Sequence, residues 1–346
     1  MLIFILNDNL ARIIQIFNRD KMKDFITTQD WEKSELDNLL RRAEDMKKNP
    51  KKYQNQLDGK SICMFFYNPS TRTRNSTQVA AFQLGMHPIF NSIKDAWIGY
   101  KSESIKDTAV VLSRYYDVIG IRIFPNAVNY IYKEGNRILR EFANWSKVPI
   151  INFEDDMYHP LQALTDIFTM QEKKQNLKGK KVTISWAYHP KPLPFSVPNS
   201  ILLNSTRYGM DVTLTHPKHY NLDDEIIQMA KKNTEESNGS LSLSNNIEEA
   251  YSDADIVYIK SWGAKKFYTD AKKEKELRLP HRDKWRIKSE YLEYTKKDSI
   301  FMHCLPIRRN IVADDDAIDG PHSVVYDQAE NRLYTIKSLL YELLKD

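Results

Sequence analysis

Short apolar runs alternate along the chain with longer stretches in which apolar residues recur at helical spacing. The run Ser61–Phe66 (SICMFF) is apolar after its first residue, a pattern typical of a strand buried on both faces. Similar runs occupy residues 118–123, 148–152, 181–186, 211–215, 256–260 and 300–303. Helical patterns occupy residues 31–48, 70–84, 129–143, 161–172, 198–208, 225–233 and 330–344. This alternation predicts an α/β protein whose parallel strands have helices on both faces.

The alternation runs through two series, and 346 residues are more than one domain usually contains. We therefore expect two doubly wound parallel-sheet domains, at residues 23–160 and 161–328. Residues 1–22 form an N-terminal extension in this scheme, and a C-terminal helix at 329–346 packs back on the first domain. The stretch 173–180 is polar apart from Leu177 and contains Gly179, which favours a linker.

Composition narrows the class of protein. The formal net charge is only +5, from 51 basic and 46 acidic residues, and the lysines are scattered among acidic residues. Both observations argue against a nucleic-acid binder, which needs a basic stripe. Cys63 and Cys304 are the two cysteines, too few for a disulfide framework or a zinc site, so a reducing, cytoplasmic location fits. No apolar run is long enough to span a membrane, and no pattern indicates a metal or a cofactor.

The first chemical motif, residues 68–74 (NPSTRTR), directly follows the strand at 61–66. Ser70 is predicted to cap the next helix, whose first N–H groups would point at any ligand there. The hydroxyls of Thr71 and Thr73 and the guanidinium of Arg72 would complete a pocket for a tetrahedral dianion. The alternative is an ordinary capped helix with surface arginines. The motif has neither a Walker pattern nor a glycine-rich fingerprint, so no nucleotide is indicated.

Four more motifs follow predicted strands or open predicted helices. They are Arg122, the pair His159 and Gln162 in HPLQ, the pair Cys304 and Leu305 in HCLP, and Arg332 near the start of the last helix. Ligands of doubly wound sheets bind beyond the carboxyl ends of the strands, so these residues are candidates for one crevice. Each also has an alternative structural interpretation, such as a surface salt bridge or a solvated helix charge.

Taken in this order and spacing, the motifs STRTR, HPLQ, HCLP and a late arginine resemble the aspartate and ornithine transcarbamylase superfamily over nearly all of residues 23–346. The resemblance implies a first domain that binds carbamoyl phosphate, a second that binds an amino-acid acceptor, and a homotrimer. It gives Thr73, Arg122, His159 and Gln162 the role of polarising the carbamoyl group. The full implied set for carbamoyl phosphate is Ser70, Thr71, Arg72, Thr73, Arg122, His159, Gln162, Cys304, Leu305 and Arg332, with Trp97 from a neighbouring subunit.

The acceptor segments resemble one branch of that superfamily. Ornithine transcarbamylases carry an aspartate where this chain has Lys260 in VYIKSWG, and a lysine there would repel an ammonium and attract a carboxylate. Residues 186–193 (WAYHPKPL) and 305–310 (LPIRRN) are similar to the N-acetylornithine and N-succinylornithine transcarbamylases. The resemblance implies that Lys260 and Arg308 bind anionic groups of the acceptor, that Glu154 and Trp186 line the same pocket, and that the second domain contains a trefoil knot.

Three features depart from that branch. The loop after residues 94–97 is shorter, the position that would sort acetyl from succinyl falls on or near Ser102, and Val312 replaces a lysine of the acetyl enzyme. The acyl group therefore stays open, as do ornithine or another amine as acceptor. A non-catalytic paralogue that binds a metabolite is the remaining alternative of a different class.

Overall fold

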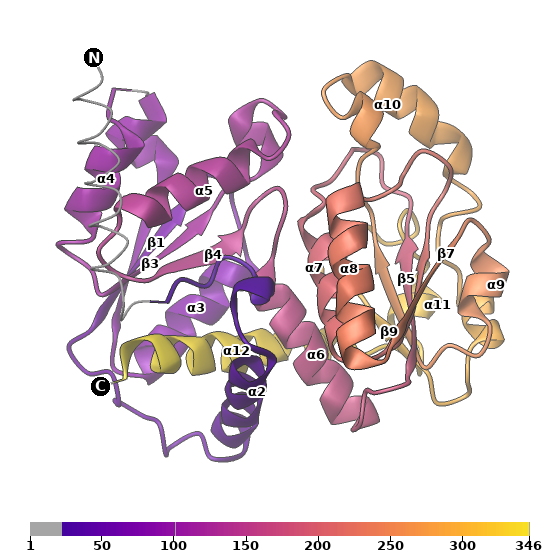
Figure 1. Ribbon diagram of the computed structural model, residues 1–346, viewed down its shortest axis with the longest axis horizontal. Coiled ribbons are helices and arrows are strands. Elements are labelled where there is room, and N and C mark those ends of the chain that lie inside the picture. The colour runs from indigo at the N-terminus through magenta and orange to yellow at the C-terminus, as the bar shows by residue number, and fades with distance from the viewer. Residues whose placement is uncertain (1–22, 101, 346) are drawn as a thin grey trace.

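The computed structural model describes residues 23–100 and 102–345, which form two lobes, each built on a parallel sheet with helices packed around it (Figure 1). The expected two-domain α/β architecture is confirmed. The expected N-terminal extension, 1–22, lies outside the described residues. Within the described ranges, no helix combines the length and the apolar character needed to cross a membrane.

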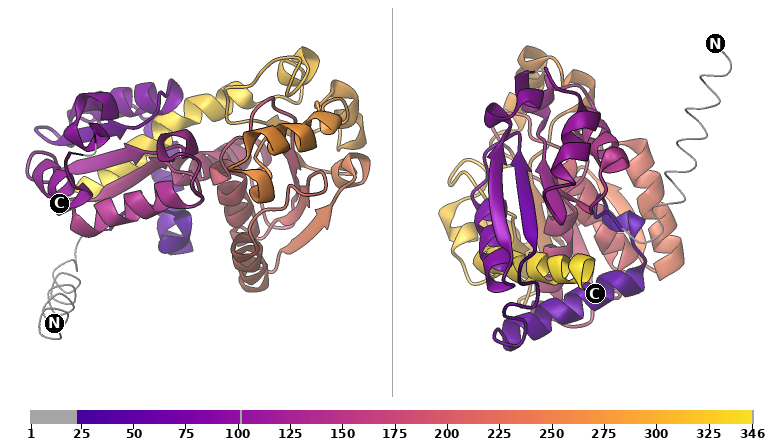
Figure 2. Two further views of the ribbon diagram at one scale, coloured as in Figure 1. Left: turned by 90° about the horizontal axis from the view of Figure 1, so that it is seen from above. Right: turned by 90° about the vertical axis from the view of Figure 1, so that its left-hand side faces the viewer.

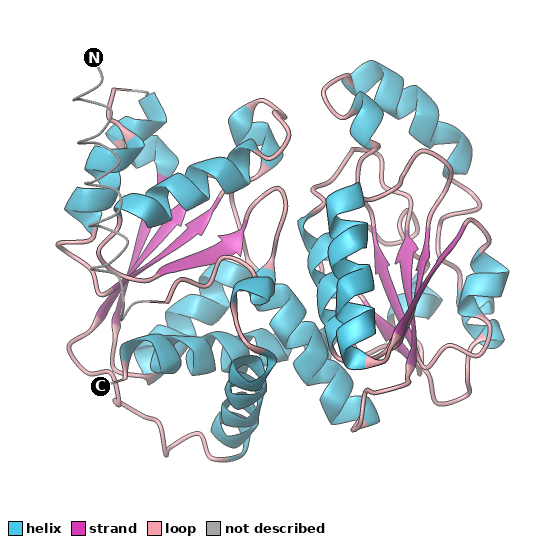
Figure 3. Cartoon of the chain, viewed as in Figure 1, coloured by secondary structure: helices cyan, strands magenta, loops and turns pink. Residues whose placement is uncertain are grey.

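The first sheet has the strand order β2 (His87–Ser92), β1 (Ser61–Phe66), β3 (Val118–Arg122) and β4 (Ile150–Glu154), with every pair parallel. Side chains alternate along β1. Met64 and Phe66 join a core with α3 (Arg72–Gln83), whereas Cys63 and Phe65 join a second core with α4 (Ile105–Leu112) and α5 (Glu134–Trp145). Because both faces of this sheet are covered (Figure 3), its two inner strands, β1 and β3, are mostly apolar.

The second sheet has the order β7 (Ser240–Ser244), β6 (Asp211–Thr215), β5 (Lys181–Trp186), β8 (Ile256–Lys260) and β9 (Ile300–Met302), again all parallel. The α-helices of this domain are α7 (Ser196–Arg207), α8 (Asp224–Ser237), α9 (Ile247–Tyr251), α10 (Ala271–Arg278) and α11 (Asp315–Ile318). Short 3-10 turns in the two domains cover Thr28–Asp30, Ile93–Asp95, Trp97–Tyr100, Pro125–Val128, Lys265–Phe267, Leu279–His281 and Ser289–Tyr294.

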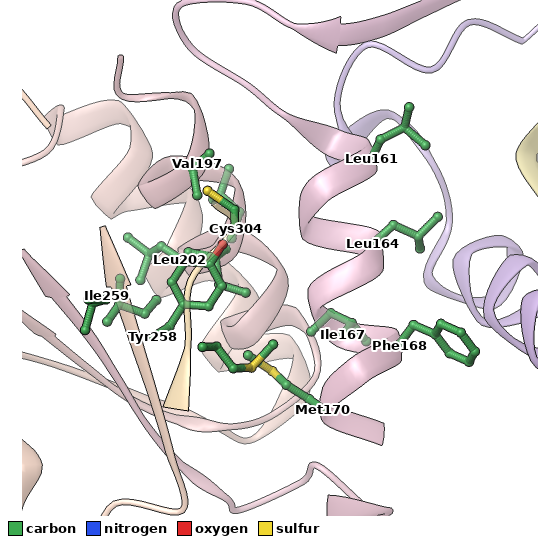
Figure 4. Close-up of a cluster of buried hydrophobic side chains, with 14 of the residues drawn as sticks. Leu161, Leu164, Ile167, Phe168, Met170, Val197, Leu202, Tyr258, Ile259 and Cys304 are labelled. Carbon is green, nitrogen blue, oxygen red and sulfur yellow. The ribbon is translucent and has the colours of Figure 1, made fainter. Parts of the chain in front are cut away.

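Two helices connect the lobes. In α6 (Pro160–Lys174), Leu164 and Phe168 point to one side while Ile167 and Met170 point to the other, where Tyr258 of β8 lies (Figure 4). The final helix, α12 (Val325–Leu344), starts beside β9 and runs into the first lobe, where it packs against α2 (Lys33–Lys48), α3 and α6 (Figure 2). Both helices therefore bring side chains to the boundary between the domains.

Several element boundaries differ from the sequence prediction. The strands β2 and β7 were not predicted, because His87–Ser92 mixes Pro88 with polar residues and Ser240–Ser244 alternates serine with leucine at a sheet edge. Ser70 is not the N-cap of α3: the helix starts at Arg72, and its N-cap residue, Thr71, makes no side-chain capping bond. The helix predicted from residue 129 begins only at Glu134, after Asn129, Tyr130 and Lys133 adopt positive φ.

Candidate active site

A cavity of about 430 Å³ lies between the two domains and is lined by both. Its residues follow the carboxyl ends of β1, β3, β4, β5, β8 and β9, or lie on α3, α6, α7 and α12. The lining residues are Pro69, Ser70, Thr71, Arg72, Thr73, Arg122, Phe124, Glu154, His159, Gln162, His189, Leu193, Pro194, Val197, Lys260, Cys304, Leu305, Pro306, Arg308 and Arg332. This position at the strand ends is the one that parallel α/β sheets use for ligands.

Arg332 of α12 is the most deeply buried cation of the cavity, with 2% of its surface exposed. Its Nη1 donates to Gln162 Oε1 at 2.7 Å and lies 3.3 Å from His159 Nε2, and its Nη2 donates to Thr73 Oγ1 at 3.2 Å. Among the described residues no carboxylate forms an ion pair with Arg332, and its Nε has no partner. Burial lowers the pKa of Arg332 to about 10. A buried, uncompensated guanidinium beside Arg72 favours an anionic ligand here.

Arg122 and Glu154 form an ion pair within the cavity. Arg122 Nη1 donates to Glu154 Oε2 at 2.7 Å, and Ser196 of α7 donates to the other oxygen, Oε1, at 2.8 Å. Glu154 therefore holds a first-domain arginine while it also bonds to the second domain. A ligand that engages Arg122 would compete with this pair.

His159 is a neutral imidazole in this setting. Burial and, after it, the charges of Arg332 and Arg122 hold its pKa well below the ordinary 6.5. Its Nε2 lies 3.5 Å from Glu154 Oε2, and its Nδ1 has no hydrogen-bond partner in the described part of the chain. A neutral ring keeps one N–H to donate, which suits a carbonyl oxygen that gains negative charge.

The second domain contributes two further cations to the cavity lining. Lys260, at the end of β8, is 9% exposed, and its ammonium makes no hydrogen bond or ion pair with any residue of the described ranges. Arg308 lies beyond β9. Burial and, after it, the positive charges of Arg308 and Lys260 lower the pKa of His189 to about 4. With Glu154 as the only carboxylate among the lining residues, the cavity is suited to two anionic ligands at once.

The structure brings nearly all predicted site residues into this one cavity. Trp186 is one of two exceptions and corrects the prediction: its side chain is fully buried, donates from its indole N–H to the Trp262 carbonyl oxygen at 3.0 Å, and packs against Tyr220 and Trp285. It does not line the cavity. Trp97 also lies outside it and is 71% exposed.

Sequence reasoning missed His189 and the apolar lining at Leu193, Pro194 and Val197. The same signal that identified the other motifs was available, since these residues lie in the segment directly after β5. Their loop is held to the rest of the domain by backbone bonds: the Gly263 N–H donates to the Leu193 carbonyl at 3.1 Å and the Tyr188 N–H to the Trp285 carbonyl at 2.8 Å.

Fold and site together define a two-domain α/β enzyme with an arginine-rich cleft for anionic substrates, and comparison with known proteins identifies the family. Residues 23–172 match the family described as aspartate/ornithine carbamoyltransferase, carbamoyl-P binding domain, and residues 195–343 match its Asp/Orn binding domain. The chain belongs to the aspartate/ornithine carbamoyltransferase family and is a carbamoyltransferase.

Individual relatives are similar over almost the whole length. An N-acetylornithine carbamoyltransferase of Xanthomonas axonopodis pv. citri is 43% identical, covering 93% of this chain and 96% of that protein. An ornithine carbamoyltransferase of Halalkalibacterium halodurans is 38% identical, covering 94% and 96%. A crystal structure of acetylornithine transcarbamylase complexed with acetylcitrulline aligns with a TM-score of 0.88 at 41% identity, covering 94% of this chain and all of that one.

Proposed function

We propose that the protein transfers the carbamoyl group of carbamoyl phosphate to the side-chain amine of an N-acylated ornithine, giving the N-acylcitrulline and phosphate in arginine biosynthesis. The observation that carries this proposal is that one cavity gathers cations from both domains. Arg72 and Arg122 come from the first domain, Arg332 from α12, and Lys260 and Arg308 from the second domain. The acetylcitrulline in the structure of a 41% identical relative supports the acceptor.

For carbamoyl phosphate, we assign the phosphate to Ser70, Thr71, Arg72 and Thr73 at the start of α3. The free helical N–H groups there add to the hydroxyls and the guanidinium. Arg332 bonds to Thr73, so its charge reaches the same dianion. This places the carbonyl end of the donor deeper in the cavity, toward α6 and β9.

The carbonyl oxygen then faces Arg122, His159 and Gln162, while the backbone at Cys304 and Leu305 receives the carbamoyl amide. The neutral amine of the acceptor attacks the carbonyl carbon, a C–N bond forms, and the electron pair of the breaking C–O bond leaves with phosphate. Phosphate also accepts the proton that the amine loses. Each placed donor contributes about 2.7–4 kcal/mol to stabilising the charge on the oxygen. This sequence uses no metal, cofactor or protein base.

We assign Lys260 and Arg308 to the carboxylate of the acceptor, and Glu154 lines the same cavity. Free ornithine fits this arrangement less well, because its α-ammonium would face the unpaired charge of Lys260. Ornithine or another amine remains the second candidate acceptor, supported by relatives named ornithine carbamoyltransferase. Whether the acyl group is acetyl or succinyl is decided by assay.

We also propose a cytoplasmic homotrimer in which each subunit contributes Trp97 to the cavity of its neighbour. Large apolar side chains are exposed on the first domain: Phe82 is 76% exposed on α3, and Val111 of α4 and Tyr115 just after it are 40% and 70% exposed. Burial of such a surface favours association. Light scattering on the purified protein checks the trimer, and a Trp97→Ala variant that assembles but loses turnover checks the shared site.

The domain limits and the knot are part of the same proposal. We assign carbamoyl phosphate binding to residues 23–160, acceptor binding to 161–328, and the C-terminal helix to 329–346. The trefoil knot is placed at the loop after β5, which the bonds from Tyr188 to Trp285 and from Gly263 to Leu193 hold between distant segments. An experimental trace of the chain through this loop tests the knot.

One experiment tests the reaction. Isotopically labelled carbamoyl phosphate is offered in parallel with ornithine, N-acetylornithine, N-succinylornithine and putrescine, and labelled product is measured. We expect product with an N-acylated ornithine. An Arg72→Ala variant should lose carbamoyl phosphate binding, whereas Arg282→Ala, which changes an exposed arginine outside the cavity, should keep it. Binding of carbamoyl phosphate without product from any acceptor would instead support a non-catalytic paralogue.

A further inference from the structure

Asp166 is a fully buried carboxylate on α6, and it is not itself one of the residues that line the cavity. One of its oxygens, Oδ1, accepts two hydrogen bonds: from Gln162 Nε2 at 2.7 Å and from Gln328 Nε2 at 2.6 Å. The two amides come from different helices, α6 and α12. One buried oxygen atom therefore holds two glutamine side chains, and each of these makes a further hydrogen bond toward the site.

The first branch leads to the anion-binding arginine. Because Gln162 donates its amide to Asp166, its oxygen Oε1 is turned toward the cavity, where it accepts from Arg332 Nη1 at 2.7 Å. Asp166 thus decides which way the amide of Gln162 faces. With the amide reversed, an NH₂ group would face the guanidinium and repel it. Arg332 would then lose its shortest contact.

The second branch leads to the loop after β9. Gln328 donates to Asp166, so its oxygen Oε1 accepts from the His303 N–H at 3.0 Å. His303 Nδ1 in turn accepts from the Leu305 N–H at 2.8 Å. The backbone at Cys304 and Leu305, which line the cavity, is therefore held through Gln328 by the same carboxylate.

We propose that Asp166 is a positioning residue that sets both parts of the carbamoyl phosphate site, orienting Arg332 through Gln162 and the loop 303–305 through Gln328. This inference rests on the proposed function. The physical basis of this role is that the donors and acceptors of the site must be held in place before the substrate binds. When one hydrogen bond of a buried network is removed, the side chains that it held also lose their orientation. Asp166 contacts no substrate in this account and takes no part in the chemistry.

Four variants of the full-length protein test the two branches. Asp166→Ala removes the shared acceptor, and Asp166→Asn keeps an oxygen that can accept from both amides. Gln328→Leu cuts the second branch alone. Thr165→Val is the matched control, because Thr165 is the preceding residue of α6 and its buried hydroxyl bonds to Thr335 of α12 at 2.6 Å without reaching the site.

Binding of carbamoyl phosphate is measured by calorimetry, and kcat and KM by labelled-product assay, together with the melting temperature. Asp166→Ala should weaken carbamoyl phosphate binding and lower kcat by about tenfold or more each, because buried donors are left unpaired. Asp166→Asn should restore both to within about threefold of the native protein. Gln328→Leu should lower kcat by about tenfold while the Kd stays within about twofold.

Thr165→Val should lower the melting temperature and leave kcat and Kd unchanged, which separates positioning from stability. The inference is overturned if Asp166→Ala loses stability as Thr165→Val does and keeps native kcat and Kd. If Asp166→Ala does not fold, unchanged kcat in Gln328→Leu overturns the second branch, and failure of Asp166→Asn to bind carbamoyl phosphate overturns the first. Failure of the native protein itself to bind carbamoyl phosphate would instead refute the proposed function.

Discussion

Replacing Lys260 by methionine removes one of the two charges that we assign to the acceptor carboxylate and keeps most of the side-chain volume. Lys260 is 9% exposed, so its ammonium lies in a region where water screens charges poorly. In the free protein, among the described residues, it has no ion-pair partner to lose. The charge should therefore matter in the complex with the acceptor rather than in the fold.

The size of the effect follows from the contact that the acceptor carboxylate would make. Two unit charges about 4 Å apart attract by about 4 kcal/mol at an effective dielectric constant of about 20, before desolvation is subtracted. The net value of a hydrogen bond to a charged group is about 1.5–3 kcal/mol. We therefore expect kcat/KM for the N-acylated ornithine to fall about 10- to 150-fold in Lys260→Met.

The assay varies the acceptor at saturating carbamoyl phosphate and adds a thermal melt. The Kd for carbamoyl phosphate should stay within about twofold, and the melting temperature should be unchanged or raised, because an unpaired buried cation is removed. Lys266→Met is the control, since Lys266 is exposed on the same stretch of chain. Native kcat/KM in Lys260→Met, or equal losses for the acceptor and for carbamoyl phosphate, would refute the assignment of the acceptor carboxylate to this lysine.

Three further predictions concern other parts of the molecule. Burial raises the pKa of Asp155 from 3.8 to about 7, so the folded state holds a proton that the unfolded chain releases. The free energy of unfolding of the native protein, relative to that of Asp155→Asn, should therefore fall as the pH rises from about 4 to about 7. Denaturant titrations measure this difference, and a difference that does not depend on pH would contradict the prediction. Gly120→Ala would place a Cβ 2.0 Å from the Phe153 ring and should cost about 1–3 kcal/mol in urea unfolding, partly recovered by adding Phe153→Leu. His159→Asn should lower kcat by about 10²- to 10³-fold if the ring donates to the carbonyl. Because the pKa of His159 lies well below 6.5, a plot of kcat/KM against pH for the native protein should show no break near pH 6.5.

Much of the architecture could be predicted from the sequence, because strands buried on both faces consist of consecutive apolar residues. The strands β1, β5, β6 and β8 begin and end where those runs do. Two of the edge strands, β2 and β7, carry no such signal. The strand β7 exposes Leu243 and alternates it with serines, so its pairing with β6 was visible only in the folded sheet.

The gathering of the motifs NPSTRTR, Arg122, HPLQ and HCLP was also predictable, since each ends or follows a strand and parallel strands end at one edge of their sheet. The sequence alone could not decide which side chain of a segment enters the cavity. After β5, the indole of Trp186 turns into the core against Trp285 while His189 lines the site. Which of these side chains lines the cavity depends on the path of the chain beyond β5, and that path is fixed by hydrogen bonds to residues far away in the sequence.

Arg332 shows most clearly what tertiary structure adds. In the sequence it is one charge on an amphipathic helix, with nothing to distinguish it from a solvated arginine. Because α12 returns to the first domain and packs against α2, α3 and α6, the same residue becomes 2% exposed and bonds to Thr73 and Gln162. Contacts between residues far apart in the chain, here 73 and 332, are set by the packing of whole helices, and local sequence pattern does not encode them.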